Sequence, residues 1–497
     1  MNMQKKLANG IAYSIALILI TASTAQAGGF FALPRGVRGV AQGGALVAGS
    51  DSPDALWYNP AGLTQAGNQL LLDFVLPIQG VDFERVNAGG VGMDDPYNNP
   101  FRDDVIEPTV RGTSATLPIP GLAYTFDLGL RDWNFGMAMM APSATLMKWP
   151  ATIVEPDTGT TLSAPQRYSI LSMEGSAMAK LILGGGYQAT DNLSLGASLG
   201  VLTGRFQVQS AMSIHEAGFG LGAPESEATD AIANVVVPFF ISPSMSLGLV
   251  YRMGDFRVGL SAETATTLSG QAKVQVDLEQ SREAYGGLVG NVEVNGEDAQ
   301  FEAPFPWIVR GGLEYKPTDA VRIELSLTVE GWSRQSKITA TPENVSIDEL
   351  PFLGWDGEGY ALAPIEMERN MRDVYALGLG TEWDVTPTLS LRTALMFETG
   401  AFDDAYMNVM TPDTDKVLLS VGGGYQIDES VLAELTVGYL VMRDREVNTS
   451  KVYRPQAIRP AQPEPSDGAY ELGDPVPLGN GRYGFQGATI ALGLRWM

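Results

Sequence analysis

Apolar and polar residues alternate with a period of two along most of this chain, which is the pattern of β-strands. The clearest run covers residues 321–330, where one face carries Val, Ile, Leu, Leu and Val and the other carries Arg, Glu, Ser, Thr and Glu. In a soluble sandwich the apolar face would form the core, whereas in a membrane barrel it would face lipid and the polar face would line the lumen. The alternation leaves both architectures open.

The spacing of the alternating runs favours the membrane barrel. Short turns and long loops alternate between the runs, which is typical of outer-membrane barrels. The short turns lie at residues 128–132, 190–191, 253–255, 317–319, 385–387 and 428–430. The strands are expected near residues 68–85, 115–127, 133–149, 167–189, 192–214, 239–252, 256–278, 299–316, 320–338, 370–384, 388–399, 416–427, 431–446 and 484–497. The sequence therefore predicts an all-β fold, a 14-stranded antiparallel transmembrane β-barrel over residues 68–497, with both termini in the periplasm.

Aromatic residues mark one end of the predicted strands. Each short turn is preceded by one of them, namely Tyr124, Tyr187, Tyr251, Tyr315, Trp383 or Tyr425. Phenol and indole rings favour a membrane interface because one end of the ring is apolar and the other forms hydrogen bonds to water or headgroups. We therefore expect a girdle of aromatic side chains at the periplasmic interface.

The first residues have the features of a secretory signal peptide. Lys5 and Lys6 precede an apolar stretch from Ile11 to Ile20, and an Ala-Gln-Ala site follows at residues 25–27. The alternative is a membrane anchor, for which the apolar stretch is too short. We expect residues 1–27 to be removed, and beyond them no apolar stretch is long enough for a spanning helix.

Composition narrows the possible functions. The chain has no cysteine, which excludes disulfides, thiolate metal sites and cysteine nucleophiles, and its one histidine is His215. A formal net charge of −25 makes nucleic acid a poor partner. We expect no metal and no cofactor.

Residues 28–67, between the signal peptide and the first strand, do not alternate like a lipid-facing strand. A barrel of this size encloses a wide lumen, so we interpret this segment as a plug, or hatch, inside it. A periplasmic tail is the alternative, but the segment contains large apolar residues that favour burial: Phe30, Phe31, Leu33, Leu56, Trp57 and Leu63.

Three parts of this segment resemble a known family. They are Gly29-Phe30-Phe31, the run RGVAQGGA at residues 38–45 and the run DSPDALWYNPAGL at residues 51–63. Asn-Pro alone is only a turn signal. Between a signal peptide and a first strand, however, the Asn-Pro-Ala core resembles the hatch of the FadL/TodX family of outer-membrane transporters of hydrophobic compounds.

The resemblance implies a function and a set of site residues. It implies passive uptake of long-chain fatty acids or of aromatic or aliphatic hydrocarbons through the outer membrane of a Gram-negative bacterium. Asn59, Pro60 and Ala61 would hold the hatch in shape. The ligand gate would consist of the mature N-terminal residues Gly28, Gly29, Phe30 and Phe31.

A further resemblance concerns the wall of the barrel. Residues 135–138 followed by Ala141, Pro142 and Ser143 are similar to the family's third strand, whose kink opens the wall sideways. Proline cannot donate a hydrogen bond to a sheet and a closed barrel has no edge, so Pro142 predicts a local break, or alternatively a simple bulge.

Other functions have weaker support. Gly-Ala-Ser-Leu-Gly at residues 196–200 matches a lipase nucleophile pattern around Ser198, but it lies inside a predicted strand, and the one possible base is His215. A general porin for small polar solutes would explain inward polar residues such as Arg322, Glu324 and Arg392. An adhesin or purely structural barrel is also open.

The expected partners follow from this interpretation. They are a hydrophobic small-molecule ligand, outer-membrane lipid and lipopolysaccharide, and the barrel-assembly machinery, with no nucleic acid. We expect a monomer. The terminal aromatic residue that the assembly machinery reads is here the penultimate Trp496, before Met497.

Overall fold

The computed structural model describes residues 34–85, 109–114, 118–142, 147–154, 159, 161–213, 230–279, 293–348, 360–361, 364–410, 412–453 and 477–497. The predicted signal peptide, the predicted gate at residues 28–31, Ser143 and His215 lie outside these residues. Among the helices in the described part of the chain, none has the length and apolar character to cross a membrane.

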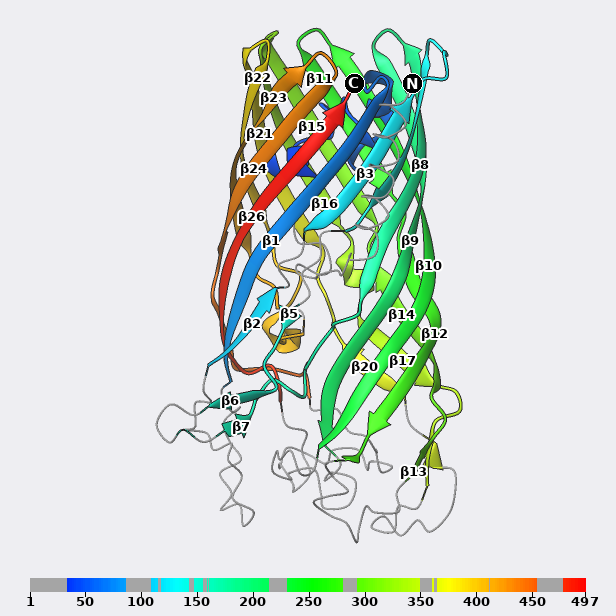
Figure 1. Cartoon of the computed structure of the whole chain (residues 1–497), viewed down its shortest axis with the longest axis vertical. Coiled ribbons are helices and arrows are strands. Elements are labelled where there is room, and N and C mark those ends of the chain that lie inside the picture. Colours follow the sequence, from blue (N-terminus) through cyan, green and yellow to red (C-terminus); the bar gives the residue numbers. More distant parts are fainter. Residues whose placement is uncertain are drawn as a thin grey trace, which may run out of the picture.

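Within the described residues, fourteen antiparallel wall strands form a closed barrel (Figure 1). The barrel closes where β1 pairs with β26 along its length, from Leu70 with Trp496 to Arg85 with Gly481. In chain order the wall strands, some of them interrupted, are β1 (Gln69–Arg85), β2 with β3 (Val110–Ser114, Ile119–Phe126), β4 with β5 (Trp133–Met140, Met147–Lys148), β8 (Ala177–Thr190), β9 (Leu193–Ser213), β10 (Asp230–Met253), β11 with β12 (Phe256–Glu263, Thr266–Asp277), β14 with β15 (Asp298–Phe305, Ile308–Thr318), β16 with β17 (Val321–Glu330, Lys337–Pro342), β20 with β21 (Ile365–Glu368, Val374–Thr386), β22 (Leu389–Glu398), β23 (Lys416–Asp428), β24 with β25 (Val431–Met442, Arg445–Val447) and β26 (Gly481–Trp496).

Smaller elements lie between the wall strands. β6 (Thr152–Val154) pairs with β7 (Thr161–Ser163), and β13 (Glu293–Asn295), β18 (Ser346–Asp348) and β19 (Tyr360–Ala361) form a separate small sheet. Two short 3-10 helices, η3 (Trp332–Arg334) and η5 (Asp404–Tyr406), follow β16 and β22. The small sheets lie at the end of the barrel opposite the short turns, at the bottom of Figure 1.

The predicted number and direction of the strands are confirmed, but the predicted starts of β8 and β10 are wrong by ten and nine residues. β8 begins at Ala177 rather than at residue 167, because Arg167 and Tyr168 bind Asp230 and hold this stretch in turns. β10 begins at Asp230 rather than at residue 239, and its pairing with β9 shifts register between Val237 and Phe240. That irregularity moves the inward residues from odd to even positions, so the alternation in the sequence breaks there.

The outer face confirms the predicted girdle. All six aromatic residues before the short turns are exposed, with exposed fractions between 37% and 58%. On β16 the predicted lipid face is also outward, since Leu325 and Leu327 are each 46% exposed while Glu324 is 5% exposed. The short turns and the C-terminus lie together at the top of Figure 1, which we name the periplasmic end. The opposite end is the outer end.

The polarity of the wall inverts along its length, and β9 shows this most simply. Near the periplasmic end its outward residues are apolar, as at Leu195 and Leu199, and its inward residues are small, as at Ser194 and Ser198. Towards the outer end the outward residues become polar, as at Arg205, while the inward residues become large and apolar: Phe206 and Val208. In that outer half, inward side chains from several strands form one large apolar cluster, which also includes Ile170 and Phe402 from the outer connections.

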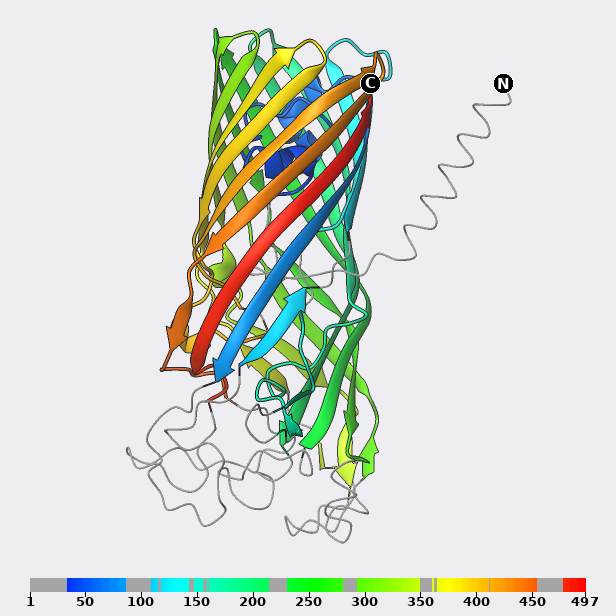
Figure 2. The same cartoon turned by 60° about the vertical axis from the view of Figure 1, so that its left-hand side comes forward.

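Residues 34–67, named the lumenal segment below, lie inside the barrel. Figure 2 shows this segment in dark blue, surrounded by strands in the half near the periplasmic end. It contains two short α-helices, α2 (Val37–Ala41) and α3 (Ala55–Tyr58), and the 3-10 helix η1 (Pro60–Gln65). Asn59 caps η1 by accepting a hydrogen bond from the Ala61 N–H, and Pro60 occupies the first position, where a missing N–H costs nothing.

Candidate functional site

A chain of charged side chains joins the lumenal segment to the wall. Arg38 and Asp51 come from the segment, and the other members project inward from seven different strands. In order, with opposite charges adjacent, the members are Arg257, Glu314, Arg322, Asp51, Arg38, Glu382, Arg392, Glu434 and Arg495. We name this set the ionic chain. The charged side chains of the ionic chain are therefore paired with one another.

The links at the centre of the ionic chain are short and sheltered. Arg38 lies 2.6 Å from Asp51 and 2.8 Å from Glu382, and Arg322 reaches the second oxygen of Asp51 at 2.6 Å. The Arg38 side chain is only 2% exposed. Removing one partner from such a pair leaves a buried charge uncompensated, at a cost of about 3–5 kcal/mol.

The two charges of the segment hold each other in the ionised state. Burial alone would raise the pKa of Asp51, but the guanidinium groups of Arg38 and Arg322 outweigh it and hold that pKa well below its usual value. For Arg38, burial lowers the pKa, but Asp51 and Glu382 outweigh this and raise the pKa well above its usual value. Both residues therefore stay charged at neutral pH.

A second anchor uses the backbone of the segment. The carboxylate of Glu324, which lies on β16, accepts hydrogen bonds from the N–H groups of Val47, Ala48 and Gly49 at 2.6, 3.0 and 2.7 Å. Such charge-assisted bonds are among the stronger hydrogen bonds in proteins. Glu324 thus fixes the loop between α2 and α3 against the wall.

The Asn-Pro-Ala motif lies against two wall glycines. Asn59 donates hydrogen bonds to the carbonyl oxygens of Val47 at 2.8 Å and Leu249 at 3.1 Å, so it ties the segment both to itself and to β10. A Cβ atom at Gly196 would collide with Pro60 and Ala61, and one at Gly248 would collide with Asn59. The motif therefore depends on glycine in the facing strands, and its predicted role in shaping the hatch stays a prediction.

A cavity lies on the outer side of the segment, where the polarity of the wall inverts. It holds about 450 Å³ of empty space, its mouth included. One wall of it is Trp57 of the segment, and the remaining lining comes from the barrel: Pro142, Lys180, Leu202, Ser244, Glu263, Thr266, Phe305, Pro306 and Ile308. We name it the apolar pocket. It connects the segment with the apolar cluster of the outer half, since Leu202 and Phe305 belong to both.

The wall beside the apolar pocket is interrupted. β4 pairs with β8 from Trp133 and Tyr187 as far as Met140 and Lys180. Among the described residues, no pairing joins these two wall strands beyond Met140, and β5 pairs with β2 instead. Pro142, two residues past the end of β4, is buried and lines the pocket together with Lys180. The predicted lateral opening coincides with this interruption, and its use by a ligand stays a prediction.

Comparisons with known proteins agree with this geometry. The family described as outer membrane protein transport protein (OMPP1/FadL/TodX) matches residues 18–463. The chain belongs to the OMPP1/FadL/TodX family. It is thus an outer-membrane protein, as the sequence predicted, and the members of this family are transport proteins rather than enzymes.

Two curated relatives of this OMPP1/FadL/TodX protein have low sequence identity to it. The 47 kDa outer membrane protein of Pasteurella multocida is 23% identical over 198 residues, which are 39% of this chain and 42% of that protein. Outer membrane protein P1 of Haemophilus influenzae is 20% identical over 294 residues, which are 55% and 57% of the two chains. The chain thus matches about half the length of these curated relatives.

Solved structures show the shared fold. A Pseudomonas aeruginosa FadL homologue has a TM-score of 0.69 at 15% identity, with 95% of this chain and 99% of that chain covered. The toluene transporter TodX of P. putida has a TM-score of 0.54 at 15% identity, with coverages of 92% and 96%. These similarities support the fourteen-stranded barrel.

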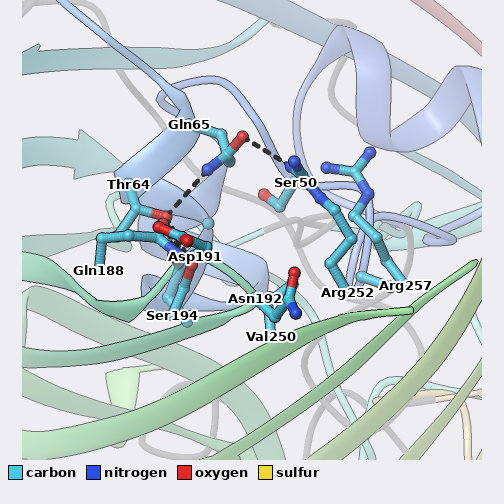
Figure 3. Close-up of a pocket in the computed structure, with 13 residues that line it drawn as sticks. Ser50, Thr64, Gln65, Gln188, Asp191, Asn192, Ser194, Val250, Arg252 and Arg257 are labelled. Atoms are coloured by element: carbon cyan, nitrogen blue, oxygen red, sulfur yellow. Dashed lines mark hydrogen bonds between the residues drawn. The ribbon is translucent and has the colours of Figure 1, made fainter. Parts of the chain in front are cut away.

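A second, polar cavity lies on the periplasmic side of the segment in this OMPP1/FadL/TodX chain (Figure 3). It lies between η1, the β8–β9 turn and β10, and its empty space, open solvent included, is about 300 Å³. Thr64 donates a hydrogen bond to Ser194 at 3.0 Å, and Arg252 donates one to Gln65 at 3.1 Å. The segment therefore has a polar periplasmic side and an apolar outer side.

The lipase-like motif has no catalytic surroundings in the described structure. Ser198 is 4% exposed and lies in the middle of β9, paired with Gly184 on one side and Ser246 on the other. A nucleophile of this type requires a sharp turn between a strand and a helix. The motif is therefore part of the regular wall.

Sequence reasoning missed the two charged residues of the apolar pocket, Lys180 and Glu263. A signal was present, because Lys180 is a cation among apolar neighbours in the run from Ala177 to Leu183. It also missed the roles of Arg38 and Asp51. Their importance depends on partners such as Glu382, which lies 344 residues from Arg38 in the chain.

Proposed function

We propose that the protein is a passive outer-membrane channel for the uptake of hydrophobic small molecules, such as long-chain fatty acids or aromatic and aliphatic hydrocarbons. The observation that carries this proposal is the polarity of the interior. Apolar side chains fill the outer half and continue to the apolar pocket, and the lumenal segment occupies the membrane half on the periplasmic side of the pocket. Such a route attracts molecules that gain about 25 cal/mol per Å² of apolar surface removed from water.

In this proposal the lumenal segment acts as the hatch. The ionic chain and Glu324 anchor it to the wall, so a ligand in the apolar pocket meets a fixed floor rather than an open pore. By resemblance, Gly28, Gly29, Phe30 and Phe31 form the gate, and they directly precede this segment in the chain. Movement of the gate would shift the pocket between closed and open populations.

The proposed exit is sideways into the bilayer. The ladder between β4 and β8 ends at Met140, next to Pro142 in the lining of the apolar pocket. A ligand that leaves there enters lipid without crossing the polar, periplasmic side of the segment. TodX, to which this chain is similar in fold, is described as a toluene transporter, which supports a hydrophobic cargo.

A general porin is the alternative, and the ionic chain argues against it. In an open porin, inward charges such as Arg322 and Arg392 would face water, whereas here they bind Glu314, Glu382 and Glu434 around the segment. We therefore propose low ionic conductance in planar bilayers. A large, steady current through the wild-type protein would favour the porin. Catalysis is not part of the proposal.

The main test is an uptake experiment. Labelled long-chain fatty acid and labelled aromatic hydrocarbon are supplied to cells with and without this protein. We expect the protein to accelerate uptake of at least one of them. Equal uptake of both compounds in the two strains would reject the transport function.

The lateral exit has its own test, which uses the absence of native cysteines. If the ladder continued by two residues, Pro142 would face Met178, because Met140 faces Lys180. A Pro142→Cys/Met178→Cys pair should block uptake when oxidised and restore it when reduced. The control pair is Met137→Cys/Leu183→Cys, which joins residues already paired in the ladder and should have no effect.

The remaining partners are also proposals. We propose that the protein is a monomer surrounded by outer-membrane lipid and lipopolysaccharide, and that the barrel-assembly machinery inserts it. In the structure the last strand ends at Trp496, which faces Leu70 and Val431 in the two neighbouring strands. No nucleic acid partner is proposed.

A further inference from the structure

A buried ion pair forms part of the lining of the apolar pocket. Lys180 projects inward from β8 and Glu263 from the end of β11, and each side chain is only 12% exposed. Two strands, β9 and β10, lie between them in the wall. The facing residues of those strands are Gly200 and Ser244, which pair with each other in the ladder, and both are small enough for the bridge to pass over them.

The residues around this ion pair leave space for the Lys180 side chain and contact its ammonium group. A Cβ atom at Gly200 would lie too close to the Cε atom of Lys180 and to the hydroxyl of Ser244. The ammonium group of Lys180 also lies over the ring of Trp57, 5.2 Å from its centre, where a cation is attracted to the aromatic face. The pair therefore joins three parts of the molecule: β8, β11 and the lumenal segment.

The pair determines the charge that a ligand meets. Among the described residues that line the apolar pocket, Lys180 is the one cation and Glu263 is the one anion, so the lining has no net charge. The other lining side chains are apolar, carry only a hydroxyl or, at Trp57, carry an indole N–H. The pocket thus offers hydrogen bonds without offering an unpaired charge.

We propose that this ion pair makes the apolar pocket selective for uncharged hydrophobic molecules that carry one hydrogen-bonding group, such as long-chain alcohols or alkylphenols, over fatty-acid anions. The proposal rests on the proposed function and narrows its substrate class. A neutral hydroxyl can accept a hydrogen bond from Lys180, whose ammonium group has three donors, while Glu263 stays paired.

A carboxylate cannot bind in the same way. To reach Lys180 it must displace Glu263, which then keeps the Ser244 hydroxyl and the nearby charge of Arg310 but loses its ion pair in an apolar pocket. If it leaves the ion pair intact, its own charge is buried without a partner. Both arrangements incur a large desolvation penalty, whereas an alcohol of the same length incurs neither.

The test compares two ligands of equal chain length, dodecan-1-ol and dodecanoate, both radiolabelled. Uptake is measured at pH 8, where the acid is ionised because carboxyl groups titrate near pH 4–5. Cells that produce the full-length protein are compared with cells that lack it. The measured quantity is the ratio of protein-dependent alcohol uptake to protein-dependent acid uptake.

The decisive variant is Glu263→Gln, which leaves Lys180 without its anion. We expect wild type to prefer the alcohol, and we expect the variant to reduce this preference at least about tenfold by gaining acid uptake, which corresponds to about 1.4 kcal/mol. The double variant Lys180→Met/Glu263→Gln should not gain acid uptake. The exchanged variant Lys180→Glu/Glu263→Lys, which keeps a neutral pair, should keep the wild-type preference.

The outcomes separate the two proposals. If wild type carries both ligands but Glu263→Gln leaves the ratio unchanged, or if the double variant gains acid uptake equally, the selectivity proposal is overturned. If wild type carries neither ligand faster than cells without it, the transport function itself fails. Folding of each variant is checked by the mobility shift that intact barrels show on heating, and the exchanged variant keeps the test valid if Glu263→Gln does not fold.

Discussion

The two halves of the barrel have opposite polarity although the same strands build them. In the membrane half, β9 places leucines outward and serines inward, and the interior contains the ionic chain. In the outer half, the same strand places Arg205 outward and Phe206 inward. The difference shows that alternation specifies a strand but not which face is the core. The medium outside the wall, lipid in one half and water in the other, decides this.

The largest expected effect comes from breaking the ionic chain at its centre. Arg38→Met would remove one of the two cations that Asp51 and Glu382 share, the other being Arg322, at a cost of at most about 3–5 kcal/mol. We expect the lumenal segment to detach and ionic conductance in planar bilayers to rise sharply. The control is Lys148→Met, which breaks an exposed pair with Glu174 and should change nothing. Unchanged conductance in Arg38→Met would show that the chain does not hold the segment.

The second prediction tests where the membrane half of the barrel ends, by substitutions on the outward face of the wall. Leu325 faces outward on β16 and pairs with Leu379, four residues from the girdle residue Trp383. This places Leu325 about 10 Å from the interface, near the middle of the apolar band. Leu325→Arg should therefore cost about 2–4 kcal/mol in urea titrations of the barrel folded into lipid vesicles. On the outward face of β12 in the outer half, Gln275→Arg should cost nothing measurable, and equal losses for both would contradict the boundary.

The third prediction concerns the wall glycines under the Asn-Pro-Ala motif. Gly196→Ala adds a Cβ atom against Pro60 and Ala61, where the backbone cannot move away easily. We expect a loss of about 1–3 kcal/mol by overpacking, together with a smaller rise in conductance than for Arg38→Met. Gly311→Ala is the matched control, because its added Cβ atom meets only the Leu260 side chain at an ordinary 3.6 Å. Equal behaviour of the two variants would mean that the segment does not depend on close contact with the wall.

The smallest effect is expected from acid. Because Arg38 and Arg322 hold the pKa of Asp51 well below its usual value of about 3.9, its stabilising charge is fully present above that value. The contribution is lost only as the pH falls through the lower, folded-state pKa. Protonation of Asp51 should therefore raise conductance only below about pH 4. In Asp51→Asn conductance should already be raised at neutral pH, and a wild-type rise between pH 7 and pH 5 that is absent from Asp51→Asn would contradict this.

Much of the wall was predictable because the features that identify each strand lie within that strand and its turns. Period-two alternation, short turns and the aromatic girdle are local features, and they gave the fourteen strands and the outward face of residues such as Leu325. The errors lie in the outer half. The register shift at Val237 and Phe240 moved the inward face of β10, so residues 230–238 resembled a loop.

The interior was less predictable because its contacts join distant parts of the chain. Asn59, Pro60 and Ala61 were identified by resemblance to a family, not from their physical properties. The links from Arg38 to Glu382 and from Lys180 to Glu263 depend on which inward positions meet across the lumen. Strand alternation shows that these side chains point inward but not which of them become neighbours.

The contacts of the lumenal segment imply an order of folding. The lumenal segment directly precedes β1, so it is synthesised first, yet its partners Glu382, Arg392 and Glu434 belong to strands made much later. Contacts between such distant residues form slowly, because a long loop must close before they contribute. The ionic chain can therefore be completed only when most of the wall exists, although Arg35 of the segment can already pair with Asp73 of β1. Docking of the segment thus belongs to the late steps of folding.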